Sequence, residues 1–377
     1  MKRFIYDQII DQENLCNMQA ETDAIMGLVN KRRNVVLYGP RNFGKTSLIK
    51  NVIIPTFKKD TPHSFVFFID LFDIRDIEHL CQLLHKELEL SFTASFPAQS
   101  LMKKTKEFLQ SLQPQISLDS LTSQPSLSLS PIRADRKPIE LDDIFKLILA
   151  ISKHHPTLIV LDEFQAICRI PTLDATFRTL FQQLLDIPII IMGSQKHMLI
   201  DLFSKPTAPL ANFGTHVEIK PIDYADYHTY IQERYNPMTI STEATTYIQD
   251  RMNRIPESIN ILADHVLIHS REDHLSSVDD PSYINLIIHQ LVENKRSFFE
   301  GLLISLSKNE ENVLIAIAKI GTLTKPKSKT FISTIRISTS AITKILFRLL
   351  QYGFLEFNSG VYTISDPLFQ IYLTTYR

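Results

Sequence analysis

A glycine-containing stretch, GPRNFGKT at residues 39–46, has the spacing of a phosphate-binding loop, G-x-x-x-x-G-K-[ST]. The two glycines allow successive backbone N–H groups to turn towards one anion. Lys45 can reach the β- and γ-phosphates of a nucleotide, and the hydroxyl of Thr46 can coordinate Mg²⁺. A helix over residues 45–57 would direct its positive dipole end at the phosphates. The predicted nucleotide-binding residues of the loop are Gly39, Pro40, Arg41, Asn42, Phe43, Gly44, Lys45, Thr46 and Ser47.

Acidic residues end a later apolar run. The run at 157–165, TLIVLDEFQ, has the composition of a buried parallel strand and ends in Asp162 and Glu163. Acids at the carboxyl end of such a strand face the crevice in which ligands bind. We therefore expect Asp162 to hold Mg²⁺ and Glu163 to polarise an attacking water, making Glu163 catalytic together with Lys45. The alternative is that the two acids only cap the next helix.

Three further apolar runs supply the rest of the expected sheet. NVVLY at 34–38 precedes the phosphate-binding loop, SFVFFIDLFD occupies 64–73, and IPIIIMGSQ occupies 187–195. The last run ends at Ser194, a catalytic candidate whose hydroxyl could contact the γ-phosphate or the water. A serine after a strand is also ordinary turn chemistry, so both interpretations stay open.

These blocks, in this order, resemble the STAND-type relatives of the AAA+ P-loop ATPases, especially the group described as ATPases predominantly from Archaea. The similarity rests on LYGPRNFGKTSLI, FIDLFDIRDIEHL, LIVLDEFQAI, IMGSQKHMLIDLF and VYTISDPLFQIYL, and it covers nearly the whole chain. The resemblance implies a three-layer α/β/α P-loop fold, a helical lid, a winged helix, and ATP/ADP with Mg²⁺ as cofactors. It assigns Lys45 and Thr46 to phosphate and Mg²⁺, Asp162 to Mg²⁺, Glu163 to catalysis and Ser194 to a polar sensor.

The chain departs from the family pattern at the arginines. Members often carry Pro-Leu-Tyr-Gly-Arg after the sensor strand, whereas this chain has PLANFGTHVEI at 209–219. A Gly-Gly-hydrophobic-Pro segment is reduced to NRIPESINIL at 253–262, which keeps Pro256 as a nucleotide-binding candidate. Arg178 and Arg254 are possible substitutes that could reach phosphate in a closed or oligomeric state, or they could be solvated surface arginines.

The bulk composition is that of an ordinary globular protein. The chain has 377 residues, 44% hydrophobic and 21% charged, with a formal net charge of −1. This balance gives no whole-chain attraction to nucleic acid or membrane, so such contacts would need a local patch. Three widely separated cysteines fit a reducing compartment, and no signal peptide or apolar span is evident, which predicts a cytoplasmic location.

We expect the chain to divide into four parts: an approach segment (1–33), an α/β core (34–222), a helical lid (223–300) and a winged-helix domain (301–377). Within the core, the Ser- and Pro-rich segment 114–138 predicts an inserted hairpin or loop, with low-complexity padding as the alternative. The lid is expected because apolar residues recur at helical spacing over 223–300. The winged helix is expected from three helical patterns followed by a hairpin signal, Asn-Ser-Gly, with Ser338 or Thr339 as the N-cap of the third helix.

Basic residues gather on the last part, and Lys344 and Arg348 lie on its third helix. They could bind DNA phosphates, or the domain could pack against the nucleotide site and transmit its state. We therefore consider a slowly hydrolysing ATPase switch first. The alternatives are an ATP-regulated DNA-binding protein similar to origin-recognition ATPases, and a nucleotide-binding scaffold without hydrolysis. A protein partner or self-association is possible for each.

Overall fold

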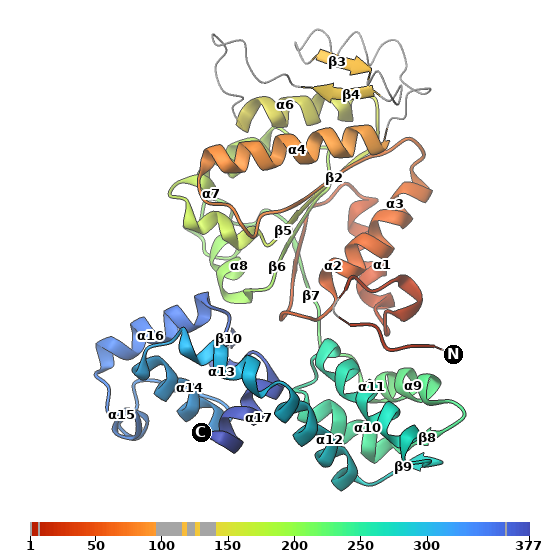
Figure 1. Cartoon of the computed structure of the whole chain (residues 1–377). Coiled ribbons are helices and arrows are strands. Elements are labelled where there is room, and N and C mark those ends of the chain that lie inside the picture. Colours follow the sequence, from red (N-terminus) through yellow and green to blue (C-terminus); the bar gives the residue numbers. More distant parts are fainter. Residues whose placement is uncertain (1, 7, 96–114, 119–124, 129–140, 359) are drawn as a thin grey trace.

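The computed structural model describes residues 2–6, 8–95, 115–118, 125–128, 141–358 and 360–377. Its centre is a five-stranded parallel sheet in the order β2-β5-β6-β1-β7. The strands are β1 (Val35–Tyr38), β2 (Phe65–Asp70), β5 (Thr157–Asp162), β6 (Ile189–Gly193) and β7 (Thr215–Glu218). Helices cover both faces of this sheet, so the predicted α/β/α class is confirmed (Figure 1).

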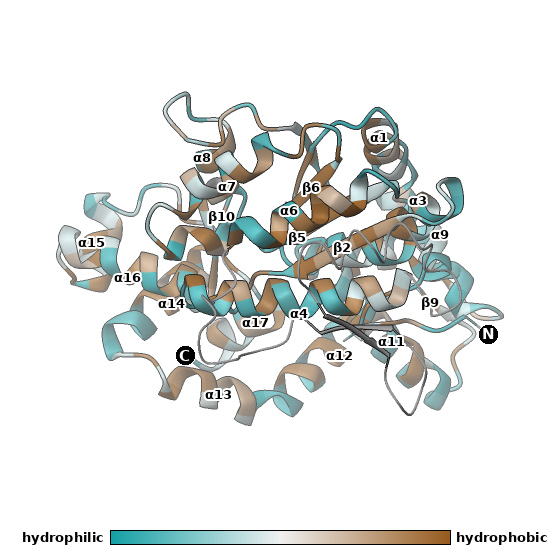
Figure 2. Ribbon diagram, turned by 90° about the horizontal axis from the view of Figure 1, so that it is seen from above, coloured by the Kyte–Doolittle hydropathy of each residue, from teal (hydrophilic) through white to brown (hydrophobic). Residues whose placement is uncertain are grey.

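Strands β1, β2, β5 and β6 are largely apolar because both of their faces are buried, whereas the edge strand β7 is polar and only partly buried. Side chains alternate between the faces: on β1, Val36 joins one hydrophobic cluster, while Val35 and Leu37 join the other. On β5, Ile159 lies in the first cluster and Leu158 in the second. Figure 2 shows the strands as a brown layer between the helices. Four helices cover the first cluster: α4 (Ile77–Ser95), α6 (Leu141–Ser152), α7 (Leu173–Gln182) and α8 (Lys196–Phe203). The second cluster is covered by α1 (Gln19–Val29), α2 (Lys45–Leu48), the π-helical turn η2 (Ile49–Ile53) and α3 (Ile54–Asp60).

The register brings the ends of the strands to one edge. Tyr38 at the end of β1 pairs with Gly193 at the end of β6 and with Glu218 of β7. Asp70 of β2 pairs with Asp162 of β5. The loops that follow these strands therefore meet at a single edge, as expected of a parallel sheet.

The inserted segment is described only in part. Strands β3 (Gln115–Leu118) and β4 (Pro125–Ser128) form an antiparallel pair, with Ile116 opposite Leu127. The other residues of the predicted insertion 114–138 lie outside the described residues.

After β7 the chain is mostly helical, in two groups. The first group, with its small parallel sheet, consists of α9 (Tyr224–Tyr235), β8 (Thr239–Ile240), α10 (Thr242–Arg251), α11 (Pro256–Glu272), β9 (Ser277–Val278) and α12 (Pro281–Asn294). The second consists of α13 (Arg296–Ile304), α14 (Lys308–Ile320), α15 (Lys329–Ile335), α16 (Thr339–Gln351), the wing strands β10 (Leu355–Asn358) and β11 (Val361–Ile364), and α17 (Pro367–Tyr376).

The second group differs from the predicted winged helix at its two ends. Lys295 ends α12 and precedes α13, so α13 crosses the boundary predicted between residues 300 and 301. A final helix, α17, follows the wing, and its N-cap Asp366 accepts hydrogen bonds from the N–H groups of Leu368 and Phe369. The predicted N-cap of the third helix is confirmed as Ser338, whose hydroxyl accepts from the N–H of Ala341.

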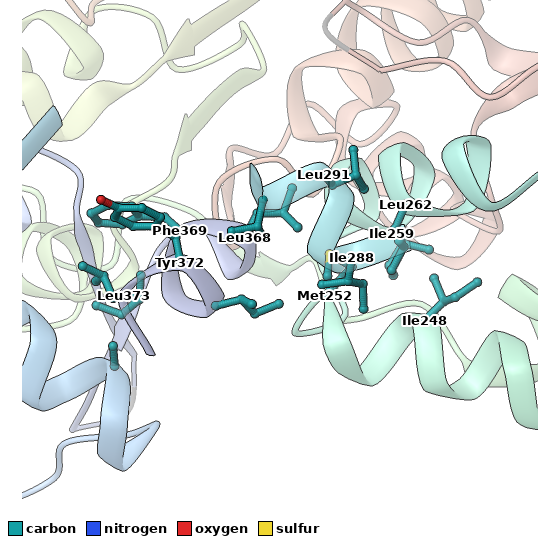
Figure 3. Close-up of a cluster of buried hydrophobic side chains, with 14 of the residues drawn as sticks. Ile248, Met252, Ile259, Leu262, Ile288, Leu291, Leu368, Phe369, Tyr372 and Leu373 are labelled. Carbon is teal, nitrogen blue, oxygen red and sulfur yellow. The ribbon is translucent and has the colours of Figure 1, made fainter. Parts of the chain in front are cut away.

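One hydrophobic cluster joins the two helical groups. Leu291 on α12 and Ile248 on α10 belong to the same buried cluster as Leu368, Phe369 and Tyr372 on α17 (Figure 3). The lid and the winged helix, expected as separate modules, thus share a continuous core.

The described residues of the N-terminal segment, 2–6 and 8–17, lie between the first helical group and the sheet domain. Arg234 of α9 is almost fully buried and holds this segment: its guanidinium donates to the carbonyl of Arg3 and to Oδ1 of Asn14, at 3.1 and 2.7 Å. It also lies over the ring of Tyr230, 3.4 Å from the centroid. On the other side, the N–H of Ile10 donates to Oγ of Ser47 and its carbonyl accepts from Asn51.

Replacing Arg234 by Met should lower the free energy of unfolding by about 2 kcal/mol, because the buried guanidinium is lost together with its hydrogen bonds to the carbonyl of Arg3 and to Oδ1 of Asn14. Urea unfolding followed by circular dichroism measures this change. The matched control is Arg251→Met at the exposed end of α10, expected within about 0.5 kcal/mol of wild type. Equal stability of the two variants would contradict this role of Arg234.

Candidate nucleotide-binding site

The phosphate-binding loop connects β1 to α2, the strand–loop–helix order that the motif requires. The expected helix over 45–57 is present but not uniform, since the π-helical turn η2 separates α2 from α3. Pro55 at the start of α3 has no N–H to continue an α-helical ladder, and the wider turn accommodates it.

Lys45 is buried within the loop. Its Nζ donates to the carbonyls of Gly39 and Pro40, at 2.8 and 2.6 Å. Burial lowers the pKa of Lys45 to about 8, while the nearby carboxylates of Glu163 and Asp162 favour the charged form. A bound phosphate would supply this ammonium with a further anionic partner.

The predicted metal ligands lie beside each other. The hydroxyl of Thr46 donates to Oδ2 of Asp162 at 2.9 Å, and Oδ1 of Asp162 accepts from the backbone N–H of Glu163 at 2.9 Å. Burial raises the pKa of Asp162 to about 6, against the lowering effect of the Thr46 hydrogen bond. A hydroxyl and a carboxylate in contact are hard oxygen donors of the kind that Mg²⁺ prefers, so these residues fit the ion.

The two remaining polar candidates are hydrogen-bonded to each other. Oγ of Ser194, at the end of β6, donates to Oε2 of Glu163 at 3.0 Å. Glu163 itself has left-handed backbone angles, φ 50° and ψ 40°, which are uncommon for a residue with a side chain. The turn directs its carboxylate into the same cavity that Ser194 and Lys45 line.

A cavity of about 520 Å³ contains these groups. Its walls come from the phosphate-binding loop, the strand ends, the N-terminal segment and the helices α9 and α11. Pro256, at the first turn of α11, is among the lining residues, as are Tyr227 and Tyr230 of α9. The rings of Tyr227 and Tyr230 give this part of the lining the apolar surface that a nucleobase needs.

Most loop residues predicted to bind nucleotide line the cavity, with three qualifications. Gly39 and Pro40 do not line it, and they contribute through the carbonyls that hold Lys45. Ser47 lines it, but its hydroxyl accepts from Ile10 and so holds the N-terminal segment. The other lining residues of the loop are Arg41, Asn42, Phe43, Gly44, Lys45 and Thr46.

The structure does not bring the two proposed substitute arginines to the cavity. Arg178 is exposed on α7 and is not among the lining residues. Arg254 donates to the carbonyl of Ile222 and stacks on Tyr224, 4.1 Å from the ring centroid, so it fastens the start of the helical group. Arg41 of the loop is the arginine found in the lining.

The wing of the second helical group rests against the phosphate-binding loop. The main chain of Arg41 hydrogen-bonds to the carboxylate of Glu356 on β10, and this bond and the charge of Lys45 oppose the burial that raises the pKa of Glu356. Gly353, with φ 78°, lies so close to Arg41 that a Cβ there would stand 2.7 Å from the guanidinium. A negative side chain of the wing thus lies beside the cations of an anion-binding loop.

Of the two basic residues predicted to contact DNA, Lys344 and Arg348, only Lys344 has no hydrogen-bond or ion-pair partner among the described residues, which leaves it free to contact a phosphate. Lys344 is exposed on α16. Arg348 forms an ion pair with the buried Glu310 at 3.2 Å and donates to the hydroxyl of Tyr352. Arg348 is therefore engaged within the domain.

Comparison with known proteins supports the architecture. A family model described as a probable winged helix domain matches residues 297–375. No curated protein matches the sequence. The chain is similar to the structure of a Walker-type ATPase of Pyrococcus abyssi, with 18% identity over 98% of this chain and 99% of that chain and a TM-score of 0.63. It is also similar to the ORC2 protein of Aeropyrum pernix, solved as ADPNP–ADP complexes, with 14% identity over 97% and 95% of the two chains and a TM-score of 0.53.

At these identities the likeness concerns the fold. The chain has the fold of the AAA+ P-loop ATPases, followed by a C-terminal winged helix, as predicted. Within the described part of the chain, no helix has both the length and the apolar character needed to cross a membrane.

Replacing Lys45 by Met should weaken ATP binding about 100-fold, because a hydrogen-bonded cation facing the phosphates contributes up to about 3 kcal/mol. Isothermal titration calorimetry measures the affinity. Lys58→Met, at an exposed position of α3, is the matched control and should bind as wild type does. Retained affinity in Lys45→Met would place the nucleotide elsewhere.

Proposed function

We propose that this protein binds ATP with Mg²⁺ and hydrolyses it slowly, and that the state of the nucleotide controls the position of the helical lid and the winged helix. One observation carries the proposal: Lys45, the Thr46–Asp162 pair and the Glu163–Ser194 pair line a single cavity. A fold of this class supplies the phosphate contacts through the loop and the helix N-terminus.

Each residue has a role that its chemistry allows. Thr46 and Asp162 would hold Mg²⁺, which when bound neutralises phosphate charge. Lys45 would leave the carbonyls of Gly39 and Pro40 for the β- and γ-phosphates. Glu163 would accept a proton from the attacking water as the water oxygen bonds to the γ-phosphorus and ADP departs. Ser194 would orient Glu163 or contact the γ-phosphate.

Slow turnover is expected from the charges at the cavity. Efficient phosphoryl transfer to water usually has an arginine on the developing charge. Arg178 and Arg254 lie outside the cavity lining, and Arg41 is beside Glu356 and Gly353 of the wing. Release of the wing would free Arg41 to turn towards phosphate.

The contact between wing and loop supports the switch. The Glu356 carboxylate and a γ-phosphate are both anions that favour the same loop amides and Lys45. Because like charges repel at short range, ATP and the docked wing compete. The helical group and the winged helix share a core, so we propose that they move together.

The other interpretations are less well supported. The exposed Lys344 leaves DNA binding possible, but Arg348 is committed to Glu310. A scaffold without hydrolysis differs from the proposed switch in the role of Glu163, which can be tested directly.

Replacing Glu163 by Gln should slow single-turnover ATP hydrolysis at least tenfold and leave ATP affinity within about threefold of wild type, because the amide cannot accept the proton. Rapid-quench measurements with excess enzyme report the rate. Glu243→Gln, at an exposed position in the first turn of α10 and outside the cavity lining, is the control and should hydrolyse at the wild-type rate. Equal rates for wild type and Glu163→Gln would favour the scaffold.

Replacing Glu356 by Gln should tighten ATP binding roughly threefold to tenfold, since a negative charge beside the loop is removed. Competition with a fluorescent ATP analogue measures this change. The control is Glu311→Gln, which removes one negative charge from the same domain, at a residue that pairs with Lys308. This variant should bind ATP as tightly as wild type does. Weaker binding in Glu356→Gln would contradict competition between the wing and ATP.

A further inference from the structure

Gln165 is a buried polar residue directly behind the catalytic candidates. It lies in the short 3₁₀ helix η3 (Phe164–Arg169) and is only 5% exposed. Its Nε2 donates to Oε2 of Glu163, the oxygen that also accepts from Ser194. Gln165 does not line the cavity, whereas Glu163 and Ser194 do. Any effect of Gln165 on a bound nucleotide must therefore pass through Glu163.

The orientation of the Gln165 amide follows from charge. A carboxylate only accepts hydrogen bonds, so the NH₂ end of the amide must face Glu163. This leaves Oε1 of Gln165 buried and without a hydrogen-bond partner among the described residues. An unsatisfied buried oxygen costs about 1–3 kcal/mol, a cost that an apolar side chain of similar shape would not carry. Packing alone therefore does not explain why a glutamine occupies position 165, whereas its hydrogen bond to Glu163 does.

Gly193, at the end of β6, provides the space for this arrangement. A Cβ at Gly193 would overlap Oε1 of Gln165 and stand 2.9 Å from Cδ1 of Leu199. Gly193 has ordinary strand geometry and pairs in register with Tyr38, so its backbone needs no glycine. A glycine is needed at position 193 because the side-chain amide of Gln165 occupies the space that a Cβ would take. Because Gln165 is enclosed, a side chain at position 193 would displace the amide that donates to Glu163.

We propose that Gln165 is a positioning residue that, together with Ser194, fixes the carboxylate of Glu163 at the cavity, and that Gly193 is required for this. The inference rests on the proposed hydrolysis of ATP. Two donors on Oε2 of Glu163 restrict the rotation of the carboxylate, so Oε1 is the oxygen that accepts the proton of the attacking water. Such fixing affects the chemical step and not the binding of nucleotide.

The test uses Gln165→Met, which keeps the shape of the side chain and removes the donor. Single-turnover hydrolysis of saturating ATP should fall about tenfold to 100-fold, while the ATP dissociation constant stays within about twofold and the melting temperature does not fall. Gln182→Met, at the exposed end of α7, is the matched control and should match wild type in all three measurements. Gly193→Ala should reproduce the loss of rate.

A double-mutant cycle separates positioning from a general structural effect. In the Glu163→Gln background, Gln165→Met should cause no further loss, because the group that it positions is already inactive. A further loss of the same size as in wild type would overturn the proposal. So would a wild-type rate in Gln165→Met.

Crystal structures of wild type and Gln165→Met give a readout that needs no hydrolysis. The Glu163 carboxylate should remain within hydrogen-bonding distance of Ser194 in wild type and turn away in the variant. An unchanged Glu163 would overturn the proposal. If wild type fails to hydrolyse ATP while Glu163 is displaced in the variant, the proposed ATPase activity fails and the positioning role of Gln165 stands.

Discussion

The parallel pairing of β1, β6 and β5 is the constraint on which the candidate site depends. Parallel strands end at the same edge, so the loop after β1, the acids after β5 and the serine after β6 are brought together although they lie far apart in sequence. The 2.9 Å bond between Thr46 and Asp162 closes this arrangement, because it joins the first turn of α2 to the tip of β5. A shift of one residue in the register would send every core side chain of a strand to the opposite face, so burial on both faces fixes the site geometry.

The walls of the cavity are less strongly fixed than its floor. The floor is the buried sheet, whereas the walls are the N-terminal segment and the helices α9 and α11. Arg234 attaches the segment to α9, and Ser47 and Asn51 attach it to the helix that follows the phosphate-binding loop. The N-terminal segment is thereby hydrogen-bonded to both sides of the cavity, to α9 on one side and to the helix after the phosphate-binding loop on the other. These hydrogen bonds act together with Phe4, which is buried against Tyr230 and Tyr235, to hold the two sides of the cavity together.

Much of the sheet and the phosphate site could be predicted because their signals are local. The loop has a fixed spacing, and four strands are apolar runs ending in glycine, acids or serine. β7 was missed because THVE is short and only partly buried at the edge of the sheet, so it has no continuous apolar pattern. The helix α17 was not predicted although Asp366 and Pro367 are a cap and a first-turn proline, because a winged-helix pattern of three helices and a hairpin does not require a further helix.

Other parts of the site depend on contacts between distant residues. The roles of Arg234 and Glu356 arise from packing between segments that no periodicity relates, so their residue types alone did not indicate them. Arg178 was expected near phosphate as one possibility, but its place on α7 is decided by Phe177 and Leu180, which bury the opposite face of that helix. Gln165 lies two residues after Glu163, and the motif assigns chemistry only to the two acids, so it gave no role to the glutamine. A glutamine within an otherwise apolar stretch was the signal that could have found it.

The shared core of the helical group and the winged helix has a mechanical consequence. Tyr372 and Ile248 lie in one apolar cluster, so a wing that left the loop would carry α9 and α11 with it if that cluster stayed intact. The chain links this body to the sheet domain through residues 219–223 and through the N-terminal segment. In the proposed switch, separation of Glu356 from the loop would therefore be coupled to movement of Pro256 in the cavity lining. A binding partner that pulled on the wing could thus change the shape of the cavity from a distance, without contacting its lining.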